Sequence, residues 1–132
     1  MENSIKKHYT QEDIEKQYID KDITHWKVEL ECINAEITFF KKLLKNRSQE
    51  IDIKNYQNFL EKLDKKQLEN KTAIGNLINY TQKMQGINEC EDLDCETYFL
   101  NDHVIFKEKI EAFLHRYSKL KRSIFSKLNK NF

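Results

Sequence analysis

Apolar residues recur along most of the chain at alternating steps of three and four positions, the spacing that keeps one face of a helix turned toward a partner. Three such runs, here called core seams, can be traced. The first is Ile23, Trp26, Leu30, Ile33, Ile37, Phe40 and Leu44; the second is Tyr56, Leu60, Leu63, Gln67, Asn70, Ile74, Leu77, Thr81 and Met84; the third is Phe99, His103, Phe106, Ile110, Phe113, Tyr117, Leu120 and Ile124. Three core seams predict three long helices.

The residues between the seams predict where the helices begin and end. Ser48 is the expected N-cap of the second helix, with Asp52 as an alternative start. Gly86 is expected at the C-cap of that helix, and Asp92 or Asp94 at the start of the third. We therefore expect helices at about residues 10–46, 50–86 and 93–129.

These boundaries leave only short connections, which make neighbouring helices antiparallel. The sequence thus predicts one all-α domain over residues 1–132, an antiparallel up-down-up three-helix coiled-coil-like bundle. Its composition agrees, because many tight turns between strands are implausible in a chain of 132 residues with no proline and only two glycines. Gly75 and Gly86 cannot form a Gly-rich phosphate-binding motif. Gly75 follows Ile74 of the second seam, and we expect its missing side chain to make room for Trp26.

The predicted first helix carries a second set of apolar residues, here called the outer stripe: Val28, Cys32, Ala35, Phe39 and Leu43. At 100° per residue these positions point about 140° to 180° away from Leu30. A helix with apolar residues on two opposite faces is normally covered on both. We expect a homodimer with two-fold symmetry through the outer stripe. The alternative is that the chain ends, residues 5–19 or Phe132, fold back over it.

Polar residues inside the seams are expected to fix the alignment of the helices. Gln67 and Asn70 occupy inward positions of the second helix, near the expected level of Tyr117. Because buried polar groups need hydrogen-bond partners, the Tyr117 hydroxyl is expected to bond one of these two amides. His103 is expected to be a core histidine with its ring nitrogens satisfied.

Little in the sequence points to catalysis or to a cofactor. Cys90, Cys95, His103 and His25 gather at one end of the predicted bundle, which makes zinc a remote possibility, but the spacing lacks the close cysteine pairs of structural zinc sites. We therefore expect no metal, no cofactor and no enzymatic activity. Three cysteines without a secretory signal segment predict reduced thiols and a cytoplasmic location.

Charge is balanced overall, with 23 basic and 22 acidic residues, but it is unevenly distributed. Residues 40–58 and 112–132, the basic end, hold eleven bases and two acids, whereas residues 1–26 and 82–104, the acidic end, hold twelve acids and five bases. This distribution complements the dipoles of the first and third helices. It also allows head-to-tail assembly, or an anion-binding surface for nucleic acid or membrane. The candidate anion-binding residues are Lys41, Lys45, Arg47, Arg116, Lys119, Lys121, Arg122 and Lys127.

One local pattern is similar to that of small uncharacterised bacterial helical proteins. It consists of His25-Trp26-x-x-Glu29-Leu30, followed by Glu36-Ile37-x-x-Phe40, and of the later run from His103 to Tyr117. The resemblance implies a helical, coiled-coil cytoplasmic protein and transfers no activity. The sequence as a whole predicts a non-enzymatic interaction or scaffold module that forms a homodimer and has an unidentified protein partner, with anion binding as the alternative.

Overall fold

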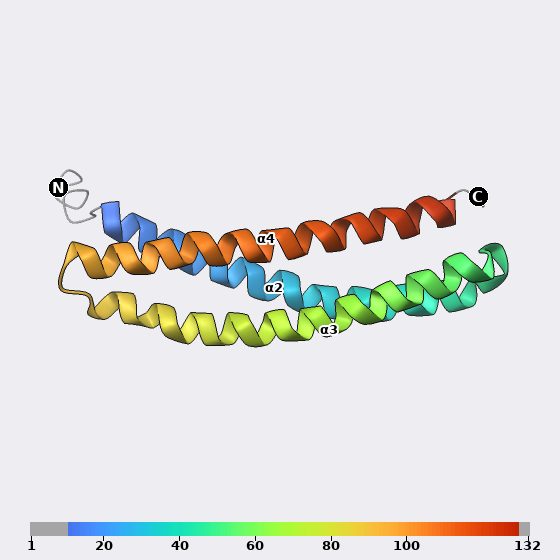
Figure 1. The fold of residues 1–132 in the computed structure, drawn as a ribbon, viewed down its shortest axis with the longest axis horizontal. Coiled ribbons are helices and arrows are strands. Elements are labelled where there is room, and N and C mark those ends of the chain that lie inside the picture. Colours follow the sequence, from blue (N-terminus) through green and yellow to red (C-terminus); the bar gives the residue numbers. More distant parts are fainter. Residues whose placement is uncertain (1–10, 130–132) are drawn as a thin grey trace, which may run out of the picture.

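The computed structural model describes residues 11–129, with side chains from residue 14 onward. Its three long helices are α2 (Gln11–Asn46), α3 (Ile53–Met84) and α4 (Leu93–Asn129), and the 3-10 turns η1 (Ser48–Glu50) and η2 (Gln85–Glu89) lie between them. The three helices lie along one long axis and successive helices run in opposite directions (Figure 1). The predicted all-α three-helix bundle is confirmed, and the described residues contain no strand.

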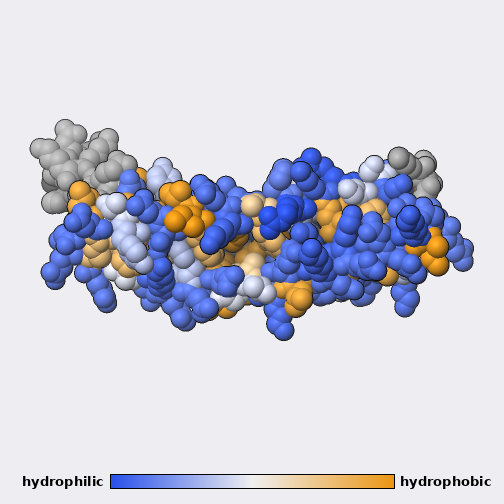
Figure 2. All heavy atoms as spheres, in the orientation of Figure 1, coloured by the Kyte–Doolittle hydropathy of each residue, from blue (hydrophilic) through white to orange (hydrophobic). Residues whose placement is uncertain are grey.

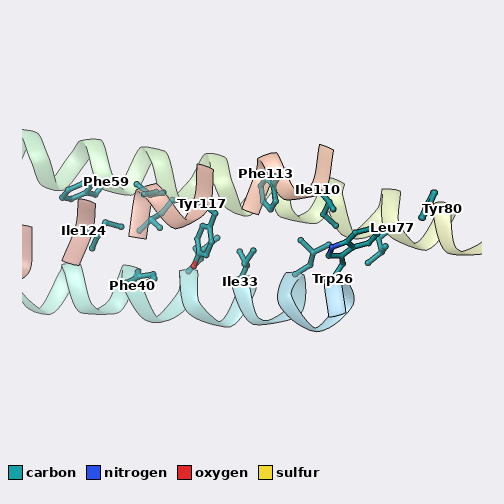
Figure 3. Close-up of a cluster of buried hydrophobic side chains, with 14 of the residues drawn as sticks. Trp26, Ile33, Phe40, Phe59, Leu77, Tyr80, Ile110, Phe113, Tyr117 and Ile124 are labelled. Carbon is teal, nitrogen blue, oxygen red and sulfur yellow. The ribbon is translucent and has the colours of Figure 1, made fainter. Parts of the chain in front are cut away.

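The core follows the predicted seams along the length of the bundle. From α2, all members of the first seam are buried except Ile23, which is partly buried. Trp26, Ile33 and Phe40 point toward side chains of α3 and α4 (Figure 3). Removing one such side chain from water stabilises the fold by about 1.5–3 kcal/mol. The seams therefore identify correctly which face of each helix turns inward.

Two buried residues of α3 lie beside its seam rather than on it. Phe59 and Tyr80 are 5% and 7% exposed and precede the seam positions Leu60 and Thr81. The buried arc of α3 is wider than its seam because the helix packs against two neighbours at once.

Aspartates cap the two helices whose first turns are described. Asp52 accepts a hydrogen bond from the backbone N–H of Asn55 at 2.9 Å, so α3 begins at Ile53 and the expected cap at Ser48 is wrong. Ser48 belongs to η1 instead. At the start of α4, Asp92 accepts a hydrogen bond from the backbone N–H of Cys95 at 2.8 Å. Asp92, one of the two residues expected at this position, is therefore the cap of α4.

Both expectations for the glycines are wrong. Gly75 is exposed, and a Cβ atom built on it would meet nothing within 4 Å, so it does not make room for Trp26. Gly86 lies inside η2 rather than at a left-handed helix end, and α3 ends at Met84 with Gln85 as its C-cap. A Cβ on Gly86 would lie 2.9 Å from Cζ of Phe99. Glycine at this position allows the Phe99 ring to approach the backbone.

The two connections between the long helices lie at opposite ends of the rod. The α2–α3 turn lies beside the end of α4, whereas the α3–α4 connection lies beside the start of α2 (Figure 1). The described residues of the basic end and those of the acidic end are therefore at opposite ends of the bundle. Between residues 11 and 129, no helix has a stretch both long enough and apolar enough to cross a membrane.

Candidate interaction surface

Four of the five outer-stripe residues are exposed on α2. Val28 and Phe39 are 53% and 58% exposed, and Cys32 and Ala35 are exposed between them. Leu43 differs, because it is partly buried and packs against the core. The surface that remains for a partner is therefore the segment from Val28 to Phe39.

The side chain of Phe39 is supported by other rings. Its centroid lies 5.8 Å from that of Phe40 in an edge-to-face arrangement, and the Phe40 ring in turn lies 5.2 Å from Phe125 of α4. These contacts hold an exposed aromatic side chain at a defined position, and such side chains contribute strongly to protein interfaces.

Polar residues border the stripe on both sides along α2. The same steps of three and four residues lead to His25 and Lys21 in one direction and to Lys42 and Asn46 in the other, and all four are exposed. The apolar surface is thus a short patch with polar boundaries. Figure 2 shows one face of the molecule, where hydrophobic atoms form isolated patches on a largely hydrophilic surface.

The alternative cover for the stripe loses part of its basis. Residues 11–19 belong to α2 itself and continue its axis, so they do not fold back over their own helix. Residues 5–10 and Phe132, the other segments of that alternative, lie outside the described residues.

The candidate anion-binding residues of the basic end divide into two groups. Lys41 contacts Asp64 at 2.5 Å and donates to Gln67 at 2.8 Å, Arg47 contacts Glu50 at 3.0 Å, and Lys121 contacts Glu36 at 3.1 Å. Lys41 and Lys121 thus pair with acids of a neighbouring helix, whereas Arg47 pairs within the α2–α3 connection. The exposed bases are Lys45, Arg116, Lys119 and Arg122, whereas Lys127 is half-buried.

Asp52 shows how the basic end affects its few acids. Hydrogen bonding from the backbone N–H of Asn55 is the main cause that lowers the pKa of the Asp52 carboxyl, and burial opposes it. The side-chain amide of Asn55 and, to a smaller extent, the charge of Lys127 lower the pKa further. The carboxylate is thereby kept in its charged, capping form.

The cysteines of the acidic end are joined to each other. Cys90 and Cys95 form a disulfide with a Cα–Cα distance of 5.5 Å, which corrects the expectation of reduced thiols. The bond links the end of η2 to the first turn of α4 and leaves no thiolate there for zinc. Among residues with described side chains, no group of three or more His, Cys, Asp or Glu is arranged to hold a metal ion. His25 contacts Glu29 at 3.0 Å instead.

His103 is the centre of a hydrogen-bond chain with one residue from each helix. Its Nε2 lies 2.8 Å from Oδ2 of Asp22 in α2, and its Nδ1 lies 2.6 Å from the hydroxyl of Tyr80 in α3. An ionised Asp22 can only accept, so Nε2–H donates to it and Nδ1 of the neutral ring accepts from Tyr80. The imidazole also stacks on Trp26, with ring centroids 5.3 Å apart. His103 is 8% exposed with both nitrogens satisfied, as expected of a core histidine.

Burial is the main influence on the Tyr80 hydroxyl. Burial raises its pKa far above the usual range, and the negative charges of Asp102 and Asp22 raise it further. A phenol in this state is a hydrogen-bond donor and a poor nucleophile. Sequence reasoning missed both Asp22 and Tyr80; each immediately precedes a seam position, so partners for a polar seam residue are best sought on the edges of neighbouring seams.

The amides of α3 have other partners than those expected. Gln67 accepts from Lys41, and Asn70 donates to the backbone carbonyl of Leu30 at 2.9 Å and to Oδ1 of Asn34 at 3.1 Å. Tyr117 donates to Glu36 at 3.5 Å, so the expected bond between its hydroxyl and an amide of α3 is wrong. Asn70 is fully buried, and its own Oδ1 has no hydrogen-bond partner among the described residues.

Two open grooves run between the helices. One of about 390 Å³ lies between α3 and α4 over Ala73 and Phe113, and one of about 330 Å³ lies between α2 and α3 over Leu30 and Leu77. The hydrogen-bond chain at His103 lines neither groove. His103 is the only buried histidine of the described residues, and a molecule bound in either of these two grooves would not contact it.

Comparisons with known proteins find no counterpart. No family model matches the chain, no curated protein matches it, and no solved structure matches it. The resemblance to small bacterial helical proteins stays a prediction.

Proposed function

We propose that this protein is a non-enzymatic helical interaction module that self-associates through the outer stripe of α2. The observation that carries the proposal is the pair of exposed side chains Val28 and Phe39, 53% and 58% exposed, on either side of the exposed Cys32 and Ala35. Their spacing is that of helices that pack against a partner helix.

A second copy is the partner favoured by the shape and size of this surface. In a two-fold interface the same patch meets itself, so a straight, short stripe on the outside of one helix is enough to complete it. Phe39 is the expected anchor, because large aromatic side chains contribute much of the binding energy of protein interfaces.

The test is the mass of the protein in solution, measured by light scattering over a range of micromolar concentrations. We expect a dimer for the wild type and a monomer for Phe39→Glu, because the substitution buries a charge in an apolar layer of the interface. The matched control is Val104→Glu on α4, where Val104 is 55% exposed. It should remain a dimer. A wild type that is monomeric throughout, or Phe39→Glu that dimerises as Val104→Glu does, would contradict the proposal.

The second candidate is an anion-binding module. It is favoured by three exposed bases of α4, Arg116, Lys119 and Arg122, which are spaced three residues apart. None of them forms an ion pair with another described residue. It is weakened by the ion pairs of Lys41, Arg47 and Lys121. Binding to a DNA duplex or to anionic vesicles at about 50 mM salt, lost at higher salt, would support it; no binding at low salt excludes it.

The cytoplasmic location remains a prediction, and the Cys90–Cys95 disulfide argues against it, since disulfides are rare in reducing compartments. Mass spectrometry of protein alkylated at the moment of cell lysis would determine whether these cysteines are oxidised in the cell.

A further inference from the structure

We infer that the two copies pair antiparallel along α2, with the two-fold axis crossing the helices between Ile33 and Asn34. This inference rests on the proposed function and names the geometry of the same surface. It follows from three independent features: the spacing of the stripe, the residues that border it, and the charges of the two ends.

The spacing of the four exposed residues of the outer stripe is symmetric. From Val28 to Phe39 the steps are four, three and four residues, so the pattern reads the same in both directions from its midpoint. In an antiparallel pair, Val28 faces Phe39 of the partner subunit and Cys32 faces Ala35 of the partner subunit. Each layer then combines a larger with a smaller side chain, which helps facing side chains to interdigitate. A parallel pair places Phe39 against itself and Ala35 against itself, and leaves the alanine layer underfilled.

The residues that border the stripe oppose the parallel arrangement. In a parallel pair Lys21 faces Lys21 of the partner subunit and Lys42 faces its own copy, so two layers hold like charges. In the antiparallel pair Lys21 lies level with Asn46 of the partner subunit, and Lys42 lies level with His25, which already contacts Glu29 at 3.0 Å. The antiparallel pair therefore has no layer of facing lysines.

The charge of the whole molecule favours the same arrangement. The described residues of the basic end and those of the acidic end lie at opposite ends of the rod (Figure 1). Antiparallel pairing lays the basic end of each copy beside the acidic end of the other, whereas parallel pairing lays like ends side by side. Complementary charge patterns select between otherwise similar arrangements of two surfaces.

Disulfide trapping distinguishes the two arrangements. Cys32 is the only free cysteine of the described residues, and Ala35 is exposed and tolerates substitution. The wild type has a free thiol at position 32 only, and the double variant Cys32→Ser/Ala35→Cys has one at position 35 only. We expect the two proteins to form a covalent dimer when they are mixed and mildly oxidised, and each to form little or none alone. The reason is that position 32 of one copy lies level with position 35 of the other, whereas two copies of the same position are offset by three residues along the helices, which disfavours a bond between them.

The outcomes separate the two proposals. If light scattering shows dimers but each protein alone cross-links to itself, the pairing is parallel and only the inference fails. If light scattering shows monomers, the proposed function itself fails. Peptide mapping of the covalent dimer identifies the bonded residues and confirms that Cys90–Cys95 is intact.

Salt provides an independent readout. The antiparallel dimer is held partly by unlike ends, so its dissociation constant should rise as salt increases from about 50 to about 500 mM. A parallel dimer has the opposite dependence, because salt screens the repulsion between like ends. A dissociation constant that falls over this range overturns the inference.

Discussion

The two faces of α2 carry apolar residues at the same spacing, yet one lies in the core and the other on the surface. The inner face is apolar without interruption from Ile23 to Leu44, and most of it is fully buried. The outer face has a continuous apolar run only from Val28 to Phe39, and polar residues separate this run from the exposed Ile14 and Tyr18 near the start of α2. A helix in a three-helix bundle has neighbours on one side only. The inner face, which has the longer apolar run, packs against those neighbours. The inner face therefore contributes to folding, and the outer face is the one that we propose for association.

Truncation on the two faces of α2 gives the largest expected contrast. Leu30 is 0% exposed, so Leu30→Ala should lower the free energy of unfolding by about 2–5 kcal/mol. Val28→Ala on the outer face should change it by no more than about 0.5 kcal/mol. Urea denaturation at low protein concentration measures both values. Equal losses for the two variants would remove the distinction between the faces.

A second contrast concerns a polar group on the inner side. His103→Phe preserves a ring beside Trp26 but leaves the buried Tyr80 hydroxyl without its acceptor, so we expect a loss of about 1–3 kcal/mol in the free energy of unfolding. Adding Tyr80→Phe should recover part of this loss, because it removes the unpaired hydroxyl. Urea denaturation of the two single variants and the double variant forms a complete cycle. Stability of His103→Phe equal to that of the wild type would mean that the hydrogen-bond chain contributes nothing.

The two glycines also lie in different environments, and we expect their substitution to change stability by smaller amounts. Gly75 is on the outside of α3 with open space around it, so Gly75→Ala should raise the free energy of unfolding by up to about 1 kcal/mol. Gly86 is against Phe99, and Gly86→Ala should give no gain or a loss, because the new Cβ atom lies 2.9 Å from Cζ of Phe99. Thermal unfolding of both variants measures the difference. A gain at Gly86 as large as that at Gly75 would show that Phe99 moves freely.

The smallest expected effect is the pH dependence from the exposed cap of α3. The pKa of Asp52 is lowered in the folded state, so its contribution is fully present above the pKa of the unfolded chain and is lost as the pH falls through the folded value. Asp52→Asn retains a capping side chain but not the charge. It should therefore lose less stability than the wild type between about pH 6 and pH 3. Equal losses, measured by urea denaturation at the two pH values, would show that this carboxyl does not contribute.

The sequence predicts the helices and their inward faces well, because heptad spacing depends only on local periodicity. It does not predict which residues meet across helices. The expected partner of Tyr117 is Gln67 or Asn70, but its hydroxyl contacts Glu36, and Gly75 is exposed rather than packed beside Trp26. Because the spacing of a seam repeats along the helix, it does not determine how one helix is rotated or shifted along its axis relative to another. That alignment depends on how long side chains at the edges of the seams pack.

The candidate sites also differ in whether local periodicity predicts them. The exposed outer stripe is visible in the sequence because it has its own periodicity. The Cys90–Cys95 bond is not, because the choice between a thiol pair and a disulfide depends on the path of a short connection. The bond between His103 and Asp22 joins residues 81 positions apart, a separation over which local patterns carry no information.

The hydrogen-bond chain through His103 also affects which misaligned states the chain can form. Apolar seams that repeat every seven residues tolerate the sliding of one helix by a full repeat, since most positions would still meet apolar partners. Sliding α4 by one repeat would carry His103 away from Asp22 and Tyr80 and bury polar groups without partners. The chain thus penalises shifted packings that the apolar residues alone would permit, and it helps the long rod to reach a single native alignment.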